Sequence, residues 1–170
     1  NLFWLFAVAG NETTRNGIPG GLIGLLGDPA AQRVLREDPS LVPGAVEEML
    51  RWWTPVMTFR RTATREVSLS GVTLQRGDKV VVSFAAANRD PEVFPDPDAF
   101  DIGRDNARRH LAFGAGPHVC LGAWLARAMM TRMFTSLLER TSWLEAAGEP
   151  AYLQSNFQRG VKRLPIAWSA

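Results

Sequence analysis

The chain has 170 residues, of which 46% are hydrophobic and 21% charged, and its formal net charge is +2. This length is enough to bury a hydrophobic core, and the composition is typical of a globular domain, which excludes disordered and fibrous proteins. Lysines and arginines are spread along the chain rather than gathered into a run, so we expect no nucleic-acid-binding surface.

The N-terminal segment predicts a long buried helix over residues 2–26, because apolar residues continue through it. Its leading apolar stretch is shorter than the roughly 20 residues of a membrane span, and no basic segment precedes it, so no membrane span is expected. We expect Pro19 to kink or break the helix, since proline lacks an amide donor and crowds the preceding turn. An apolar run that starts without a cap is typical of a helix cut through its middle, so we expect the C-terminal part of a longer protein.

Two shorter helices are expected next. An Asp-Pro pair at residues 28–29 caps a helix that runs to about residue 37, where a second Asp-Pro pair ends it. A further helix is expected over residues 42–53, because a Thr-Pro pair follows it.

The middle of the chain predicts strands and then an irregular segment. Residues 67–82 alternate apolar and polar side chains between Ser-Gly and Arg-Gly turn signals, which predicts hairpins. Residues 88–110 hold three prolines and little periodicity, which predicts an ordered but irregular meander.

The last third predicts a helix and two extended runs. Helical periodicity returns over about residues 121–140, and extended runs at 152–157 and 161–168 are joined at Arg159-Gly160. The predicted fold class is therefore mainly α with small β-sheets, in one domain without internal repeats.

The loop FGAGPHVCLG, residues 113–122, contains the only cysteine, Cys120. A single cysteine excludes an internal disulfide and favours a reducing compartment, so we expect the cytoplasm. Gly114 and Gly116 permit positive φ and let the backbone approach a flat partner closely. Cys120 stands at the start of the helix expected from Leu121, where free amides and the helix dipole favour a thiolate. Such a thiolate is a metal ligand or a nucleophile.

Other interpretations of Cys120 are open at this point. One is a buried small hydrophobe, as free cysteines usually are. Another is a zinc site with His110 and His118, although structural zinc needs four ligands and usually paired cysteines. A third is a nucleophile paired with His118, as in a cysteine-dependent hydrolase, although catalytic pairs normally meet through the fold.

The segment FGAGPHVCLGAWLAR, which begins at Phe113, resembles the haem-binding signature of cytochromes P450. In that signature a phenylalanine, two glycines, a basic residue, the ligand cysteine and a following glycine have this spacing. Two other segments agree in the family's order: EEMLR offers the Glu-x-x-Arg pair at Glu48 and Arg51, and AGNETT offers the distal-helix motif at residues 9–14. The resemblance covers essentially the whole chain.

The chain departs from the family pattern in three places, one of which is Pro19 inside the distal helix. The family usually has Arg or His before the phenylalanine of the meander, completing a triad with the Glu-x-x-Arg pair, whereas Ala99 precedes Phe100 here. Arg89 and Arg104 are the candidates for this position. The N-terminal half of the family's domain is also missing, so residues 1–170 are expected to be the C-terminal part of a single domain, without a complete active site.

The cofactor that the resemblance implies is haem b, iron protoporphyrin IX, with Cys120 as the metal ligand. The proximal thiolate favours cleavage of the O–O bond. Phe113 is expected to shield the sulfur, and His118 and Arg61 are expected to hold the haem propionates. The implied cofactor-binding residues are Ala9, Gly10, Arg61, Phe113, Gly114, His118, Cys120, Gly122 and Ala126.

The activity that the resemblance implies is a monooxygenase reaction, in which one oxygen atom of O2 is inserted into an apolar substrate. Thr13 is expected to bond its hydroxyl to the Ala9 carbonyl, Gly10 to leave room for dioxygen, and Glu12 to relay protons. Glu12 and Thr13 are therefore the expected catalytic residues. The alternative is a haem-binding remnant without turnover, because the chain is truncated.

The substrate pocket is expected to be apolar, because the positions that face it in the family are occupied here by Leu5, Ala9, Val56, Met57 and Phe157. Such a pocket favours a hydrophobic substrate. The strings AGNETTRN and SNFQRGVKRLP are similar to bacterial members that act on sterol side chains or branched lipids.

The redox partners that the resemblance implies are a ferredoxin and a ferredoxin reductase, since soluble bacterial members of the family use them. A basic surface beside the loop of Cys120 would steer an acidic ferredoxin. The arginines expected on that surface are Arg104, Arg108, Arg109 and Arg127.

Overall fold

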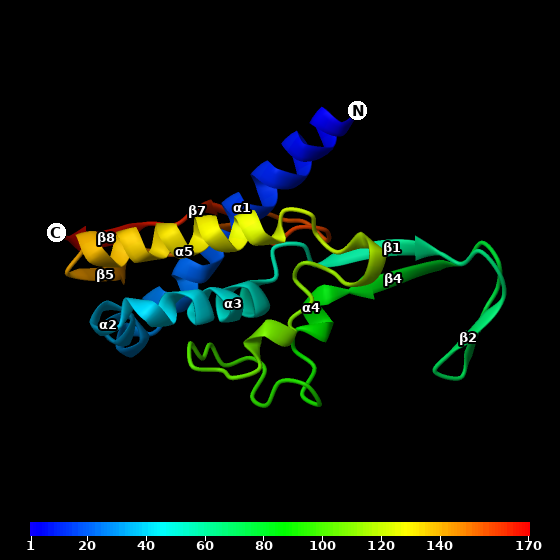
Figure 1. Cartoon of the computed structure of the whole chain (residues 1–170), viewed down its shortest axis with the longest axis horizontal. Helices are drawn as coiled ribbons and strands as arrows, with labels where there is room; N and C mark the ends of the chain where they lie inside the picture. The colour runs from blue at the N-terminus through cyan, green and yellow to red at the C-terminus, as the bar shows by residue number, and fades with distance from the viewer.

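The computed structural model describes residues 1–170, which form a helical body with small two-stranded sheets (Figure 1). The α-helices are α1 Leu2–Leu26, α2 Pro29–Glu37, α3 Val42–Trp53, α4 Phe84–Ala87 and α5 Ala123–Arg140. The 3-10 helices are η1 Pro39–Leu41, η2 Ala107–Arg109 and η3 Gly116–His118. None of the helices combines the length and the apolar character that crossing a bilayer requires.

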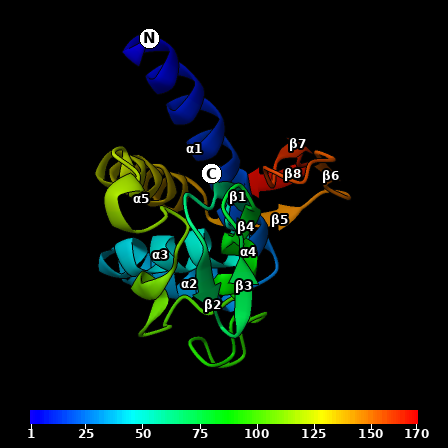
Figure 2. The same cartoon turned by 90° about the vertical axis from the view of Figure 1, so that its right-hand side faces the viewer.

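The hydrophobic core lies where α1, α2, α3 and α5 meet, and the strand β5 adds to it. In Figure 1 the helices α3 and α5 run side by side, and Figure 2 shows the first half of α1 pointing away from the body. The buried members of this core are Leu22, Leu25, Ala31, Leu35, Val42, Ala45, Val46, Met49, Leu50, Met130, Phe134, Leu138 and Leu144.

The second half of α1 approaches its neighbours through glycines. A Cβ built on Gly20 would lie 2.1 Å from the ring of Trp53, and one built on Gly24 would lie 2.8 Å from the ring of Phe100. Heavy atoms cannot approach this closely, so only glycine allows these rings to rest on the helix. The contact places α3, and with it the Glu-x-x-Arg pair, directly against α1.

The helices expected over residues 2–26, 29–37 and 42–53 are confirmed at both ends. The expected break at Pro19 is wrong, because α1 continues through this residue to Leu26. Proline removes one hydrogen bond from the helix interior, and the packing of the second half of α1 on α3 and α5 offsets that loss.

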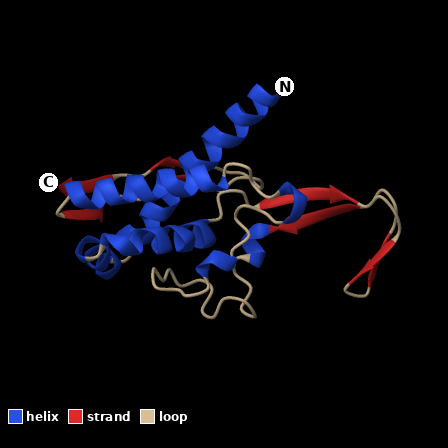
Figure 3. Cartoon of the chain, viewed as in Figure 1, coloured by secondary structure: helices blue, strands red, loops and turns tan.

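The strands form four separate antiparallel pairs, drawn in red in Figure 3. They are β1 Thr58–Thr62 with β4 Lys79–Ser83, β2 Val67–Leu69 with β3 Val72–Leu74, β5 Trp143–Ala146 with β8 Ile166–Ser169, and β6 Ala151–Tyr152 with β7 Val161–Arg163. The strands expected within residues 67–82 are confirmed, but only β2 and β3 form a hairpin with each other, because β4 pairs with β1. The expected run over 152–157 is strand only at Tyr152. Neither β1 nor β5 was predicted from the sequence.

The meander over residues 88–110 has little regular structure, as expected, apart from η2. Its order comes from the side chain of Arg51 on α3, which donates hydrogen bonds to the carbonyls of Asn88, Pro97 and Ala99 at 2.8, 2.7 and 2.9 Å. Carbonyls that have no strand partner are thus satisfied by one guanidinium.

Candidate functional site

The loop that carries Cys120 is held open by two glycines. Gly114 and Gly116 have the positive φ that was expected, +69° in both cases. Residues that carry a side chain rarely adopt this backbone conformation. The N–H of Cys120 donates to the carbonyl of Phe113 at 2.9 Å, which ties the two ends of the loop together. The cysteine is free and exposed, so the interpretation as a buried hydrophobe is wrong.

Helix α5 begins later than the sequence predicted. Its first residue is Ala123 and its cap is Gly122, so Leu121 lies outside the helix and Cys120 lies two residues before the cap. The carbonyl of Cys120 still accepts the N–H of Ala123 at 3.2 Å. The thiol therefore stands just in front of the helix N-terminus, where the dipole favours a negative charge.

The surroundings of the thiol are apolar and open. Val119 and Leu121 on either side of Cys120 are exposed, and Trp124 in the first turn of α5 is exposed as well. Exposed apolar side chains gathered in this way are typical of a surface that another molecule covers.

Helix α3 carries the expected pair Glu48 and Arg51, which is fully buried. Arg51 Nε lies 2.6 Å from Glu48 Oε2, and Arg51 Nη2 lies 2.8 Å from Glu48 Oε1, so both bonds of the fork are made. Glu48 Oε1 also accepts the N–H of Asp101 at 3.0 Å. The pair thus anchors the meander to the core.

Arg104 occupies the triad position that Ala99 leaves open. Its Nε lies 3.2 Å from Glu48 Oε2, and its side chain is 7% exposed. Arg89 instead pairs with Asp98 at 3.0 Å and makes no contact with Glu48. The expectation that Arg104 belongs to a basic surface is therefore wrong, because its guanidinium is committed to the interior.

A second buried glutamate, Glu47, was not expected from the sequence as a site residue. Its carboxylate lies 3.0 Å from His110 Nε2 and 2.6 Å from Arg127 Nε. Burial raises the pKa of Glu47, but the hydrogen bonds from His110 and Arg127 outweigh it and lower the pKa to about 2. The positive charge of Arg127 is consequently neutralised by Glu47. Arg127 therefore does not act as a free charge on the expected basic surface.

The zinc interpretation fails on the same contacts. His110 is buried, its Nε2 is bonded to Glu47, and its Nδ1 accepts the N–H of Ala112 at 3.1 Å. No cluster of three His, Cys, Asp or Glu side chains could hold a metal ion in this chain. Cys120 is left as a single thiol ligand.

The distal-helix motif lies in the exposed first half of α1. The Thr13 hydroxyl donates to the Ala9 carbonyl at 2.7 Å, which confirms the expected bond, and nothing lies within 4 Å of a Cβ built on Gly10. Glu12 is half exposed and lies 3.6 Å from Arg15. An exposed ion pair of this length contributes little to stability, so the Glu12 carboxylate is open to solvent.

Three of the expected substrate residues come together at one place. Val56 pairs with Gln158 in an isolated β-bridge, and the N–H of Met57 donates to the carbonyl of Phe157 at 2.8 Å. Leu5 and Ala9 lie in the first half of α1, and Leu5 is exposed there.

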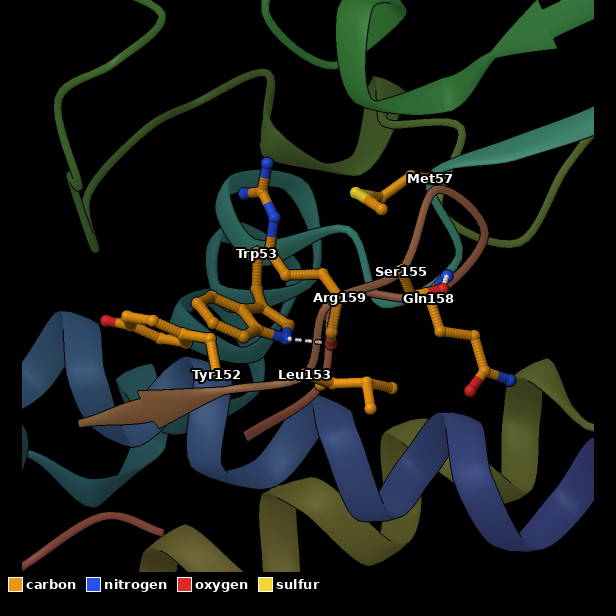
Figure 4. Close-up of a pocket in the computed structure, with 8 residues that line it drawn as sticks. Trp53, Met57, Tyr152, Leu153, Ser155, Gln158 and Arg159 are labelled. Carbon is orange, nitrogen blue, oxygen red and sulfur yellow. Dashed lines mark hydrogen bonds between the residues drawn. The ribbon is translucent and has the colours of Figure 1, made fainter. Parts of the chain in front are cut away.

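A cavity of about 320 Å³ lies beside this junction (Figure 4). Of the expected substrate residues only Met57 lines it, and the sequence did not indicate the others: Trp53, Tyr152, Leu153, Ser155, Gln158, Arg159 and Gly160. The Arg159 guanidinium lies over the Trp53 ring, and burial lowers the pKa of Arg159. No motif surrounds these residues, because the fold brings them together from two distant segments.

The expected propionate ligands are both at the surface. Arg61 lies on β1, where its side chain is exposed and its guanidinium stands 5.8 Å from the centre of the Phe59 ring. His118 ends η3 and is exposed as well. Neither side chain is tied to a carboxylate.

A family model for cytochrome P450 matches residues 2–166 of the chain. The chain belongs to the cytochrome P450 family. Its fold class, mainly α with small sheets, is that of P450 structures, and haem b is the cofactor of this family.

Two curated P450 relatives illustrate the similarity. Cytochrome P450-terp from Pseudomonas sp is 41% identical over 163 residues, which cover 96% of this chain and 38% of the relative. A methyl-branched lipid omega-hydroxylase from Mycobacterium bovis is 44% identical over 171 residues, which cover 99% of this chain and 40% of the relative. The chain thus spans about two fifths of the length of the relatives that it matches.

Solved P450 structures agree with this. P450BioI in complex with an acyl carrier protein that carries hexadec-9Z-enoic acid has a TM-score of 0.94 and 41% identity, over 97% of this chain and 43% of its own. CYP109E1 from Bacillus megaterium in complex with testosterone has a TM-score of 0.90 and 36% identity, over 95% of this chain and 45% of its own.

The residues of this P450 chain fit a haem group. A haem iron brings four nitrogen donors of its own, so it needs one protein thiolate rather than a cluster of ligands, and Cys120 is such a lone and exposed thiol. A Cβ built on Gly116 would have nothing within 4 Å, so the backbone beside the thiol leaves space for a flat ring.

Proposed function

We propose that the protein is a haem-thiolate monooxygenase that inserts one oxygen atom of O2 into an apolar substrate. The observation that carries this proposal is the exposed thiol of Cys120 on a loop with two positive-φ glycines, in front of a helix N-terminus. When bound, haem b supplies the oxygen-activating chemistry.

Residues of the cysteine loop would hold the cofactor. Cys120 would be the ligand, and the hydrogen bond from its N–H to the Phe113 carbonyl fixes the loop that carries it. His118 and Arg61 offer exposed donors for the propionates. The small residues of the loop and of the first turn of α5, namely Gly114, Gly122 and Ala126, leave room for the ring.

Thr13 and Glu12 on α1 would handle protons. The Thr13 O–H is donated to the Ala9 carbonyl, so the lone pairs of Thr13 Oγ1 would be left to accept a hydrogen bond from water. The half-exposed Glu12 carboxylate exchanges protons with solvent. Gly10 adds no side chain to this space.

The proposed substrate is a branched lipid or a sterol-like molecule. Val56, Met57 and Phe157 form an apolar junction, and Leu5 and Ala9 add apolar surface from α1. The relatives support this class, because one is a methyl-branched lipid hydroxylase and one solved structure holds testosterone.

The proposed electron donor is a ferredoxin, reduced by its reductase. Arg104 and Arg127 are paired with buried glutamates and so do not count toward this surface. The exposed arginines that remain beside the loop are Arg108 and Arg109 on η2. Two adjacent cations favour an acidic partner and raise its association rate.

A second candidate, haem binding without turnover, is favoured by one observation. The apolar side chains of Phe3, Trp4 and Phe6 are exposed, so the wall of a closed pocket is not formed by these residues. Residues 1–170 expressed alone are therefore expected to aggregate, or to bind haem loosely, without hydroxylating a substrate.

The experiment that tests the proposal is optical. The haem-loaded protein, reduced and exposed to carbon monoxide, should show the red-shifted Soret band of a thiolate-ligated carbonyl complex. Cys120→Ser should lose this band, whereas the neighbouring control Val119→Ala should keep it. A spectrum typical of histidine ligation, or one without haem absorption, would exclude the proposed function.

A further inference from the structure

Helix α3 places two adjacent buried glutamates toward different segments. Glu48 binds Arg51 and Arg104 and so holds the meander. Glu47 binds His110 and Arg127, which lie before and after Cys120 in the chain. The two glutamates share no partner, so Glu47 has a separate task at the cysteine loop.

The position of the Glu47 carboxylate is defined at both of its oxygens. Arg127 Nε lies 2.6 Å from Oε1, and Arg127 Nη2 and His110 Nε2 each lie 3.0 Å from Oε2. A carboxylate that is 4% exposed keeps its charge only with such donors, in agreement with its lowered pKa. Buried ion pairs of this kind add little net stability over apolar residues, but they do fix geometry.

The two partners of Glu47 contact the same aromatic ring. The Arg127 guanidinium carbon lies 4.5 Å from the centre of the Phe113 ring, and the ring centres of His110 and Phe113 are 5.7 Å apart. The Phe113 carbonyl in turn accepts the N–H of Cys120. A continuous chain of contacts therefore leads from Glu47 to the cysteine.

We propose that Glu47 is a positioning residue for the thiolate ligand, acting through His110 and Arg127 on Phe113 and the loop of Cys120. The proposal rests on the proposed function, since it concerns the ligand of the haem. Without the charge of Glu47, the 38%-exposed side chain of Arg127 turns to solvent and leaves Phe113 without its cation. The loop then holds the sulfur less firmly, so the sulfur is displaced from the haem more easily.

The test uses Glu47→Gln in the haem-loaded protein, which keeps the size of the side chain and removes its charge. In dilute urea, the thiolate-type carbon monoxide band should convert to the thiol-type band about tenfold faster than in the unchanged protein, the factor for losing one charge-assisted hydrogen bond. Arg127→Gln should act in the same direction. Arg127→Lys should be affected less, because the cation is kept.

The matched control is Arg36→Gln on α2, whose side chain contacts Thr141 at the C-terminal end of α5. Arg36 Nε donates to the Thr141 carbonyl at 2.9 Å, so this variant also loses a partly buried arginine contact, but far along the chain from Cys120. If Glu47→Gln converts no faster than Arg36→Gln at an equal loss of unfolding free energy, the proposal is overturned. If Glu47→Gln does not fold, Arg127→Gln decides the question by the same comparison. A thiolate band that survives in Cys120→Ser would instead refute the proposed function.

Discussion

The two halves of α1 differ in which side chains are buried: large side chains are exposed in the first half, whereas glycines are buried in the second. In the first half the side chains are large and apolar, yet Phe3 is 77% exposed. In the second half Gly17, Gly20 and Gly21 are at the contact with α3 and α5, and Leu25 is fully buried. Burial along this helix therefore depends on which elements pack against it. The apolar character of a residue in α1 does not predict whether that residue is buried.

The largest expected effect comes from filling the glycine contact. Gly20→Ala places a methyl group 2.1 Å from the Trp53 ring, so the helices must separate, and we expect a loss of more than about 3 kcal/mol of unfolding free energy. Urea unfolding measures this. Gly10→Ala in the first half is the control, because it meets no atom and should be neutral or stabilising. Equal losses in the two variants would contradict the difference between the halves.

Acid should weaken the packed body against which the second half of α1 rests. The pKa of Glu47 is about 2 in the folded chain and near 4.5 when it is unfolded, so its contribution is complete above pH 4.5 and is lost as the pH falls toward 2. We expect this loss to be about 3 kcal/mol. Unfolding free energies measured across this range should fall less steeply in Glu47→Gln. An unchanged slope would show that Glu47 gains nothing on folding.

Polar substitution in the first half should leave the unfolding free energy nearly unchanged. Phe3→Ser and Phe6→Ser remove exposed side chains, so we expect changes within about 0.5 kcal/mol. Self-association, measured by sedimentation, should decrease because the apolar surface is smaller. A large loss of stability in either variant would mean that this half is packed after all.

The smallest effect on unfolding, but a clear one on function, is expected at Thr13. Thr13→Ala removes only the local bond to the Ala9 carbonyl, so haem and substrate binding should persist. Under the proposed function, less product should form per O2 consumed and hydrogen peroxide should be released, because proton delivery is damaged. Thr13→Ser keeps a hydroxyl and should retain coupling. Equal coupling in Thr13→Ala would assign Thr13 to the helix alone.

Local signals allowed much of the fold to be predicted. The Asp-Pro pairs at residues 28–29 and 38–39 bound α2 correctly, because a cap and a fixed φ act within one turn. Pro19 misled the prediction, since the packing that overrides its local cost involves α3 and α5. The start of α5 was placed too early because the glycine at 122 caps the helix rather than continuing it.

The candidate site divides in the same way. Cys120 and Thr13 could be singled out because their motifs lie within a few residues. Glu47 could not, because its partners lie 63 and 80 residues away in the chain, and no local pattern links Glu47 to either of them. The third member of the buried triad was undecided between two arginines for the same reason, and only the contact of Arg104 with Glu48 distinguishes them.

The guanidinium of Arg51 closes the segment 88–99 as a non-covalent cross-link, since it holds carbonyls at both ends of that segment. The bend between those two ends makes no hydrogen bond to Arg51 near Pro91 and Glu92, which are both exposed. Lengthening a loop whose ends are fixed costs little, about 0.6 kcal/mol for each doubling. A peptide tag inserted at this bend should therefore cost little stability as long as Phe94 keeps its place 5.3 Å from the Arg51 guanidinium.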